Sequence, residues 1–95
     1  MKVVNDELLA EFRAAWACEW CKKRLPSGAD PAHIFSRGAG RVDIRVNLVS
    51  LCRACHQSTH DGNEPTKEQL LVVAAKRERT SPEAIRRRVY RIRRA

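Results

Sequence analysis

The chain lacks a long apolar run: no stretch approaches the roughly 20 consecutive apolar residues that a membrane-spanning helix needs. It also lacks the start of a secretory signal peptide, because the sequence turns acidic at Asp6 and Glu7, where such a peptide would be apolar. Internal repeats, low-complexity linkers and coiled-coil heptads are absent as well. We therefore expect a cytoplasmic protein with reduced thiols and no membrane partner.

The chain is also too short for a large hydrophobic core. Its 95 residues suffice for one small domain, whose core is of marginal size. Small domains often compensate with a metal ion or with disulfides, and the four cysteines suit either device. Because disulfides persist mainly in oxidising compartments, a cytoplasmic chain favours metal ligands.

Acidic residues are few relative to basic ones, which gives the chain a net charge of +8. Such an excess points to an anionic partner, and nucleic acid is the commonest one for a small basic protein. The alternative is a basic face that is only solvated. The excess is concentrated in residues 81–95, where Glu83 is the one acid among Arg86, Arg87, Arg88, Arg91, Arg93 and Arg94.

Apolar residues at three- and four-residue spacing predict an amphipathic helix over residues 5–17, capped by Asn5 or Asp6. We expect Phe12 and Trp16 on its apolar face to pack in the core, with base stacking as the alternative role.

Short strands are predicted over residues 32–36 and 42–46, with a turn at the glycines between them. Residues 47–51 are expected to be a loop or extended segment, and residues 53–59 a helix that ends at Gly62. A capping box at Thr66 starts a further helix that ends near Arg79. Ser81 then caps a last helix, which packs by a narrow apolar stripe or orders only on meeting phosphates.

Two Cys-x-x-Cys pairs, Cys18 with Cys21 and Cys52 with Cys55, are separated by 30 residues. A single pair could be a redox motif, and the four cysteines could form disulfides. Two such turns, however, offer four thiolates to one ion, which is how zinc closes a structural site. We predict a structural Zn²⁺ bound by all four.

A structural zinc site does not explain the presence of four polar residues that lie between the two cysteine pairs or just after them: His33, Asn47, His56 and His60. Each alone could be an ordinary polar residue beside a zinc turn. Their gathering around two such turns in a basic protein is harder to explain in that way. His56 and His60 are four residues apart, so the helix predicted here would place both on one face.

These residues, in the order Ala32-His33-Ile34, Asn47-Leu48 and Cys52-x-x-Cys55-His56-x-x-x-His60, resemble the motif of the HNH endonuclease family, in the subclass with two Cys-x-x-Cys turns. The resemblance covers roughly residues 18–60. It implies an α+β fold, a small treble-clef-like ββα-metal finger flanked by N- and C-terminal helices. We accordingly expect a nuclease domain over residues 1–80, with its motif core at 18–60, and an arginine-rich helix over 81–95.

The resemblance also implies residue roles. His33 matches the general base that takes a proton from the attacking water, and Asn47 matches the residue that pins the loop and so orients that base. His56 and His60 match the ligands of a catalytic divalent ion, so that His56 belongs to the catalytic set as well.

The sequence departs from the family pattern at Ala32, where many members have a third metal ligand. Because positions 30 and 32 of an extended strand point to the same side, we expect Asp30 to replace that ligand. An oxygen ligand favours Mg²⁺ or Mn²⁺, while two imidazoles keep Zn²⁺, Ni²⁺ and Co²⁺ open.

The leading hypothesis is a metal-dependent DNA endonuclease, a monomer or homodimer, encoded by a bacterium or a phage. Arg37 and Arg41 beside the glycine turn are candidates for binding the phosphate, and Arg86, Arg87, Arg88 and Arg91 for binding DNA. Two alternatives remain: a non-catalytic zinc-dependent nucleic-acid-binding module, which Ala32 favours, and a zinc-dependent protein-interaction domain.

Overall fold

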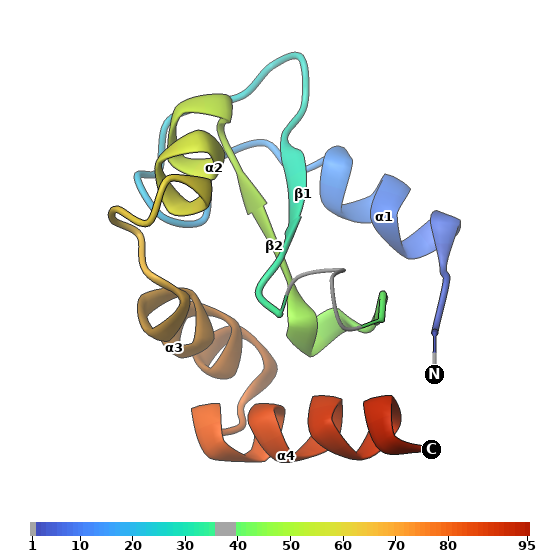
Figure 1. The fold of residues 1–95 in the computed structure, drawn as a ribbon. Helices are drawn as coiled ribbons and strands as arrows, with labels where there is room; N and C mark the ends of the chain where they lie inside the picture. The colour runs from blue at the N-terminus through green and yellow to red at the C-terminus, as the bar shows by residue number, and fades with distance from the viewer. Residues whose placement is uncertain (1, 36–39) are drawn as a thin grey trace.

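The computed structural model describes residues 2–35 and 40–95. In chain order, its elements are α1 (Asp6–Arg13), β1 (Asp30–His33), the 3₁₀ turn η2 (Arg45–Asn47), β2 (Leu48–Leu51), α2 (Arg53–His60), α3 (Lys67–Glu78) and α4 (Pro82–Arg94), as Figure 1 shows. The predicted α+β class is confirmed, with one antiparallel strand pair and four α-helices among the described residues. None of these helices is both long and apolar enough to span a membrane.

The strands lie elsewhere than the sequence suggested. β1 starts at Asp30, earlier than expected, and pairs with β2 in a register that sets Asp30 opposite Leu51. The predicted strand over residues 42–46 is wrong: Val42 forms a single bridge to Val3, and the chain then turns in η2. The segment expected to be a loop or an extended stretch, residues 47–51, is extended and contains the second strand, β2. Every residue of β2 is buried, and a strand covered on both faces has no apolar–polar alternation to reveal it.

Helix α1 is shorter than the predicted helix. Asn5 caps it as expected, accepting the backbone N–H of Leu8 at 3.0 Å. The helix ends at Arg13 because the following residues join a short hairpin, in which the Trp16 carbonyl accepts the N–H of Leu25 at 2.7 Å. The helical pattern of apolar residues therefore continues past the end of the helix itself.

The two aromatic residues of this segment have opposite environments. Phe12 is buried, as predicted. Trp16 lies beyond the helix and is 78% exposed, so the prediction that it packs in the core is wrong.

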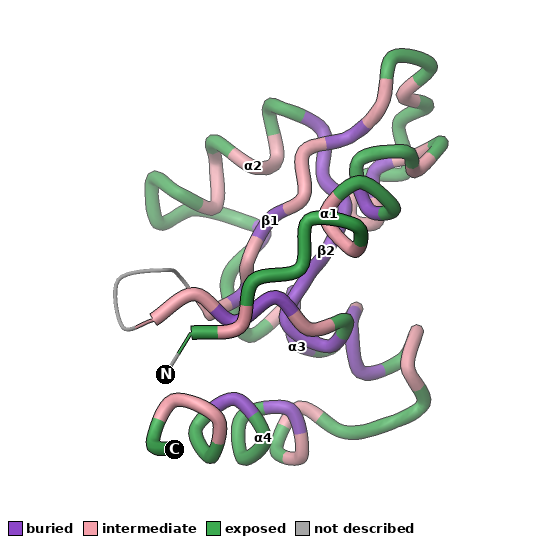
Figure 2. Tube along the Cα trace, turned by 90° about the vertical axis from the view of Figure 1, so that its right-hand side faces the viewer, coloured by how far each residue is buried: buried purple, intermediate pink, exposed green. Residues whose placement is uncertain are grey.

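The core lies between the sheet and the two C-terminal helices. Figure 2 shows buried residues along β2 and on the inward sides of α3 and α4, whereas α2 has no buried residue except its N-cap, Cys52. The capping box at Thr66 and the N-cap at Ser81 are both confirmed. Helix α4 packs by its apolar stripe, since Ile85 and Val89 belong to the core cluster.

Arg77 of α3 ties three parts of the fold together. Its Nη1 donates to the carboxylate of Glu19 at 2.7 and 3.0 Å, and its Nη2 donates to the backbone carbonyls of Arg45 and Leu48 at 2.7 and 2.9 Å. Glu19, between Cys18 and Cys21, also accepts the backbone N–H of Ser50 at 2.6 Å. The first cysteine turn, the sheet and α3 are thus joined by charge-assisted hydrogen bonds.

Candidate functional site

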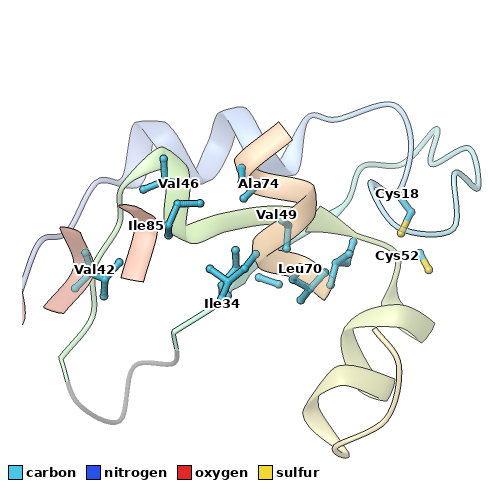
Figure 3. Packing of buried hydrophobic residues seen from close by; sticks show 14 residues of the cluster. Cys18, Ile34, Val42, Val46, Val49, Cys52, Leu70, Ala74 and Ile85 are labelled. Carbon is cyan, nitrogen blue, oxygen red and sulfur yellow. The ribbon is translucent and has the colours of Figure 1, made fainter. Parts of the chain in front are cut away.

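The four cysteines converge at one end of the core. Cys18 and Cys21 lie in the turn that follows α1, Cys52 is the N-cap of α2, and Cys55 lies in the first turn of that helix. Figure 3 shows Cys18 and Cys52 at the end of the core away from Val42. The sulfurs of all four lie within 4.8 Å of one another, and within the described ranges they are the one group of three or more histidine, cysteine or acidic residues that is placed to hold a metal ion.

This spacing fits a zinc ion. Four sulfurs bound tetrahedrally at about 2.3 Å would lie about 3.8 Å apart. The sulfurs of Cys21 and Cys52, which come from different turns, lie 3.8 Å apart. The predicted structural metal site therefore has its four donors in place, with no disulfide among them.

Backbone N–H groups support negative charge on these sulfurs. Burial by itself raises the pKa of Cys18. Hydrogen bonds from the backbone N–H groups of Cys21, Cys52 and Trp20 outweigh burial and bring this pKa down to about 7. Burial and the neighbouring thiols raise the pKa of Cys55, because a second thiolate would be placed beside the first. A cation among the four sulfurs would remove that repulsion and so favour all four thiolates.

The three histidines line one cavity of about 430 Å³. His56 and His60 are four residues apart on α2 and so share a face of that helix. His33 reaches the cavity from β1, and its remaining lining is Leu9, Arg13, Pro31 and Arg41. The structure therefore brings together three histidines that the sequence singled out.

His33 is held by a carboxylate that the sequence analysis did not identify. Its Nε2 lies 2.7 Å from Oδ1 of Asp43, whose side chain is fully buried. Arg41 donates to both oxygens of this carboxylate, with its Nη2 2.7 Å from Oδ2, and the backbone N–H of Asn5 donates to Oδ2 at 2.8 Å. Burial alone would raise the pKa of Asp43, but these hydrogen bonds outweigh it and hold the pKa at about 2.

The ionised state of Asp43 fixes the proton on His33. A carboxylate only accepts hydrogen bonds, so Nε2 of His33 must carry the hydrogen. In the neutral imidazole, Nδ1 is then the nitrogen without a proton and can act as a base. A local signal for Asp43 existed, namely an acid between Val42 and Ile44, but it did not reveal the partner ten residues away.

Asn47 joins the two sides of the loop between His33 and Asp43. Its side chain is buried; Oδ1 accepts the N–H of Phe35 at 2.8 Å, and Nδ2 donates to the carbonyls of Val42 at 2.9 Å and Phe35 at 3.3 Å. These bonds hold the residue before Asp43 close to the segment after His33. The bonds of Asn47 thus hold these two segments together, while its orienting of His33 and its part in a reaction stay predictions.

Asp30 lies against α2. Its Oδ2 accepts from Nε of Arg53 at 2.8 Å and lies 3.1 Å from Nδ1 of His56. Burial raises the pKa of Asp30, but the hydrogen bonds from His56 and Arg53 lower it more. Metal-binding histidines commonly give their other ring nitrogen to a carboxylate in this way.

Asp30 and His56 are thus adjacent, but Asp30, His56 and His60 do not gather into a second metal-binding group. Direct binding of an ion by Asp30 stays a prediction.

The predicted DNA-binding arginines differ in their surroundings. Arg41 is occupied by Asp43 and also lies 3.4 Å from Asp6, while Arg37 falls outside the described residues. Arg86 is exposed and forms an ion pair with Glu68. On the same helix, Arg87, Arg88 and Arg91 are exposed and form no ion pair with the residues that the structure describes.

Arg13 is a second residue that the sequence analysis missed. It lies at the end of α1, lines the histidine cavity and is exposed. A basic residue in the last turn of a helix is ordinary by itself, so nothing in the sequence marked it as part of a site. Its position adds positive charge to the cavity.

No protein-family model, curated protein or solved structure matches this chain. The function of the site must therefore be argued from its own side chains: a four-cysteine cluster that fits zinc, and beside it a polar cavity with three histidines. One of these histidines is paired with a buried carboxylate, and another with Asp30.

Proposed function

We propose that this protein is a metal-dependent DNA endonuclease of the HNH type, in which a treble-clef-like ββα-metal finger carries both a structural zinc and a catalytic site. The observation that supports this most is the common cavity of His33, His56 and His60. These side chains come from β1 and α2, the elements that the motif assigns to the base and to the metal ligands.

His33 acts as the general base in this proposal. Its Nδ1 takes a proton from the water that attacks phosphorus, while Nε2–H remains bonded to Asp43. The imidazole becomes positively charged in this step, and the buried carboxylate stabilises that charge. Asp43 has its own countercharge in Arg41, so it stays ionised throughout.

His56 and His60 would hold the divalent ion through imidazole nitrogens. The bond between Nδ1 of His56 and Asp30 leaves Nε2 of that ring for the ion, so Asp30 orients a ligand whether or not it is one itself. When bound, such an ion neutralises charge on the phosphate and on the leaving oxygen.

The cavity also suits an anion. Arg13 and Arg41 line it, and the acids near it, Asp30 and Asp43, are both paired with arginines. The net charge of +8 and the exposed arginines of α4 would attract the nucleic acid backbone from further away.

The second candidate function is a zinc-dependent nucleic-acid-binding module without catalysis. Ala32 favours it, because this residue is buried and has no donor atom where the family pattern often has a ligand. The histidine cavity would then bind a phosphate without hydrolysing it.

Supercoiled plasmid incubated with Mg²⁺ or Mn²⁺ separates the two candidates. The nuclease proposal expects nicked or linear products from the native chain and from Val72→Ala, a control at an exposed residue of α3 outside the cavity. It expects none from His33→Ala. Retarded plasmid without cleavage by the native chain would favour the binding module, and cleavage by His33→Ala would contradict the assigned base.

A further inference from the structure

Trp16 is a large apolar side chain that the fold leaves in solvent. It is 78% exposed, the highest value among the large hydrophobic residues described. A single exposed apolar side chain is ordinary on a protein surface, so the case for a role of Trp16 rests on what surrounds it.

The backbone of Trp16 is held in place although its ring is exposed. Its carbonyl accepts the N–H of Leu25 at 2.7 Å, and the next residue, Ala17, bridges to Arg24 in the hairpin that leads to Cys18. The four-cysteine site closes this hairpin, so the ring projects from a rigid base.

A pocket of about 490 Å³ adjoins the ring. Leu25 and Pro26 form apolar parts of its wall, and Arg13 is its one charged residue. Gly28 allows this pocket to form: its φ is +97°, and a Cβ there would lie 2.7 Å from the carbonyl oxygen of Arg13. Only glycine lets the loop approach α1 so closely.

Arg13 connects this pocket to the proposed catalytic site. It lines the Trp16 pocket, the histidine cavity, and a third cavity of about 770 Å³ that also contains Lys23 and Arg53. The acid of the third cavity, Asp30, is paired with Arg53 and His56. Arg13 therefore links the histidine cavity with the pocket beside Trp16, and together with Lys23 and Arg53 of the third cavity it forms what we call the basic path.

A basic path that ends in an aromatic ring fits an unpaired nucleotide better than a duplex. Arginine and lysine follow the phosphates, while the ring stacks on a base. In a duplex, each base already stacks on its neighbours and offers no free face, so a ring at the surface gains little there. A protein partner would also bury the tryptophan, but the positive charges of the basic path would then have no phosphates to bind.

We infer that Trp16 is the stacking platform for an unpaired base of a single-stranded segment next to the phosphate in the histidine cavity. This rests on the proposed function, because it assumes that nucleic acid occupies that cavity. The substrate class is then DNA with a single-stranded part, such as a flap, a junction or a locally melted site.

The chain contains two tryptophans, Trp16 and Trp20, so fluorescence can report on one of them. In Trp20→Phe, Trp16 is the single tryptophan, so selective excitation of indole reports on it alone. Titrating it with a 12-nucleotide oligo(dT), at fixed salt and without added Mg²⁺ so that no cleavage occurs, should quench the emission saturably. A blunt duplex of equal length should bind with much less quenching.

Affinity measurements complete the test. Trp16→Ala should weaken oligo(dT) binding by about tenfold or more and change duplex binding less than twofold, whereas Trp16→Phe should keep most of the affinity because it keeps a ring. The residue is exposed, so an unchanged circular dichroism spectrum and zinc content should confirm that each variant folds.

The outcomes distinguish this inference from the proposed function. Unquenched emission together with unchanged oligo(dT) affinity in Trp16→Ala would overturn it and leave the ring to a protein partner, even if plasmid cleavage is intact. Quenching with no cleavage by the native chain would support the stacking role while contradicting the nuclease.

Discussion

At the scale of single residues, Asp43 has the largest influence on the proposed chemistry. It is a fully buried carboxylate shared by His33 and Arg41, and it sets which nitrogen of His33 carries the hydrogen. A neutral amide in the same place could offer its NH₂ group to the ring and so favour the opposite tautomer.

We predict that Asp43→Asn lowers the cleavage rate by about a hundredfold or more, which is the range that a correctly placed general base contributes. Nitrogen NMR of His33 should show hydrogen on Nε2 in the native chain and a change of tautomer in the variant. DNA affinity, measured without Mg²⁺, should change much less than the rate. Native rates in Asp43→Asn would contradict the assigned role.

The pKa of Asp43 also predicts a dependence of stability on pH. The folded-state pKa is about 2, below the ordinary value of 3.8, so the ionised form stabilises the fold by about 2 kcal/mol above pH 3.8. That contribution is lost as pH falls from 3.8 towards 2. The carboxyl carbon resonance of Asp43 should therefore keep its ionised position down to about pH 3, and titration near pH 4 would refute the buried network.

Residue identity alone predicted part of this site. Cysteines and histidines at the spacing of metal ligands did stand out in the sequence, because few other roles require those spacings. Asp43 and Arg13 did not, since an acid in an apolar stretch and an arginine at a helix end are common. Their significance arises from contacts with residues distant in the sequence, which the fold creates.

At the scale of secondary structure, α2 serves two purposes. Its N-terminus supplies Cys52 and Cys55 to the four-cysteine cluster, and His56 and His60 face the cavity. The two sites therefore adjoin on one helix, where Cys55 directly precedes His56, but they differ in their surroundings. The cysteines lie at one end of the core, whereas the histidines lie on the more exposed side of the helix.

We predict that removing the structural metal unfolds the domain. Structural zinc contributes about 10–16 kcal/mol in small zinc-binding peptides, which is as much as the whole stability of a typical domain. A strong chelator, or Cys52→Ser, should abolish the cooperative thermal transition followed by circular dichroism.

His56→Ala is the matched comparison on the same helix. It should keep the transition and one equivalent of tightly bound zinc while losing cleavage. A His56→Ala protein that is unfolded, or a chelated chain that keeps its transition, would show that the two sites are not divided in this way.

Local patterns predicted the helix starts well and the strands poorly. Asn5, Thr66 and Ser81 cap helices because their side chains accept nearby backbone N–H groups, a purely local interaction. The two strands pair with each other across a long stretch of sequence, which no local pattern reveals. Both faces of β2 are buried, so its sequence lacks the alternation of apolar and polar residues by which a strand is usually predicted. The exposed position of Trp16 was missed for a related reason, since its helical spacing continued into a hairpin held by distant cysteines.

At the scale of the whole molecule, the arginine-rich helix α4 lies apart from α2 and its histidines. Helix α4 covers the core with one side and offers Arg87, Arg88 and Arg91 to solvent with the other. In Figure 1, it lies at the end of the molecule away from α2. Nucleic acid that reaches both must extend across the domain.

We predict that replacing Arg87, Arg88 and Arg91 together by glutamine weakens DNA binding and lowers the slope of log affinity against log salt by about two to three, which is the expected loss for three phosphate contacts. Fluorescence anisotropy with a labelled duplex over a series of salt concentrations measures this slope. Replacing Lys22 and Lys76, which line a different cavity, is the control and should alter it little. An unaltered slope in the arginine variant would place the DNA elsewhere.

The link between Glu19 and Arg77 bears on how fast the predicted zinc ion could leave the four cysteines. Glu19 lies inside the first cysteine turn, and its carboxylate bonds to α3 and to the backbone of β2 at once. The turn therefore cannot swing outward to release its ion while the sheet stays closed. We expect zinc to leave at the rate at which the β2 amides become exchangeable with deuterium, and Glu19→Gln should accelerate both processes in parallel.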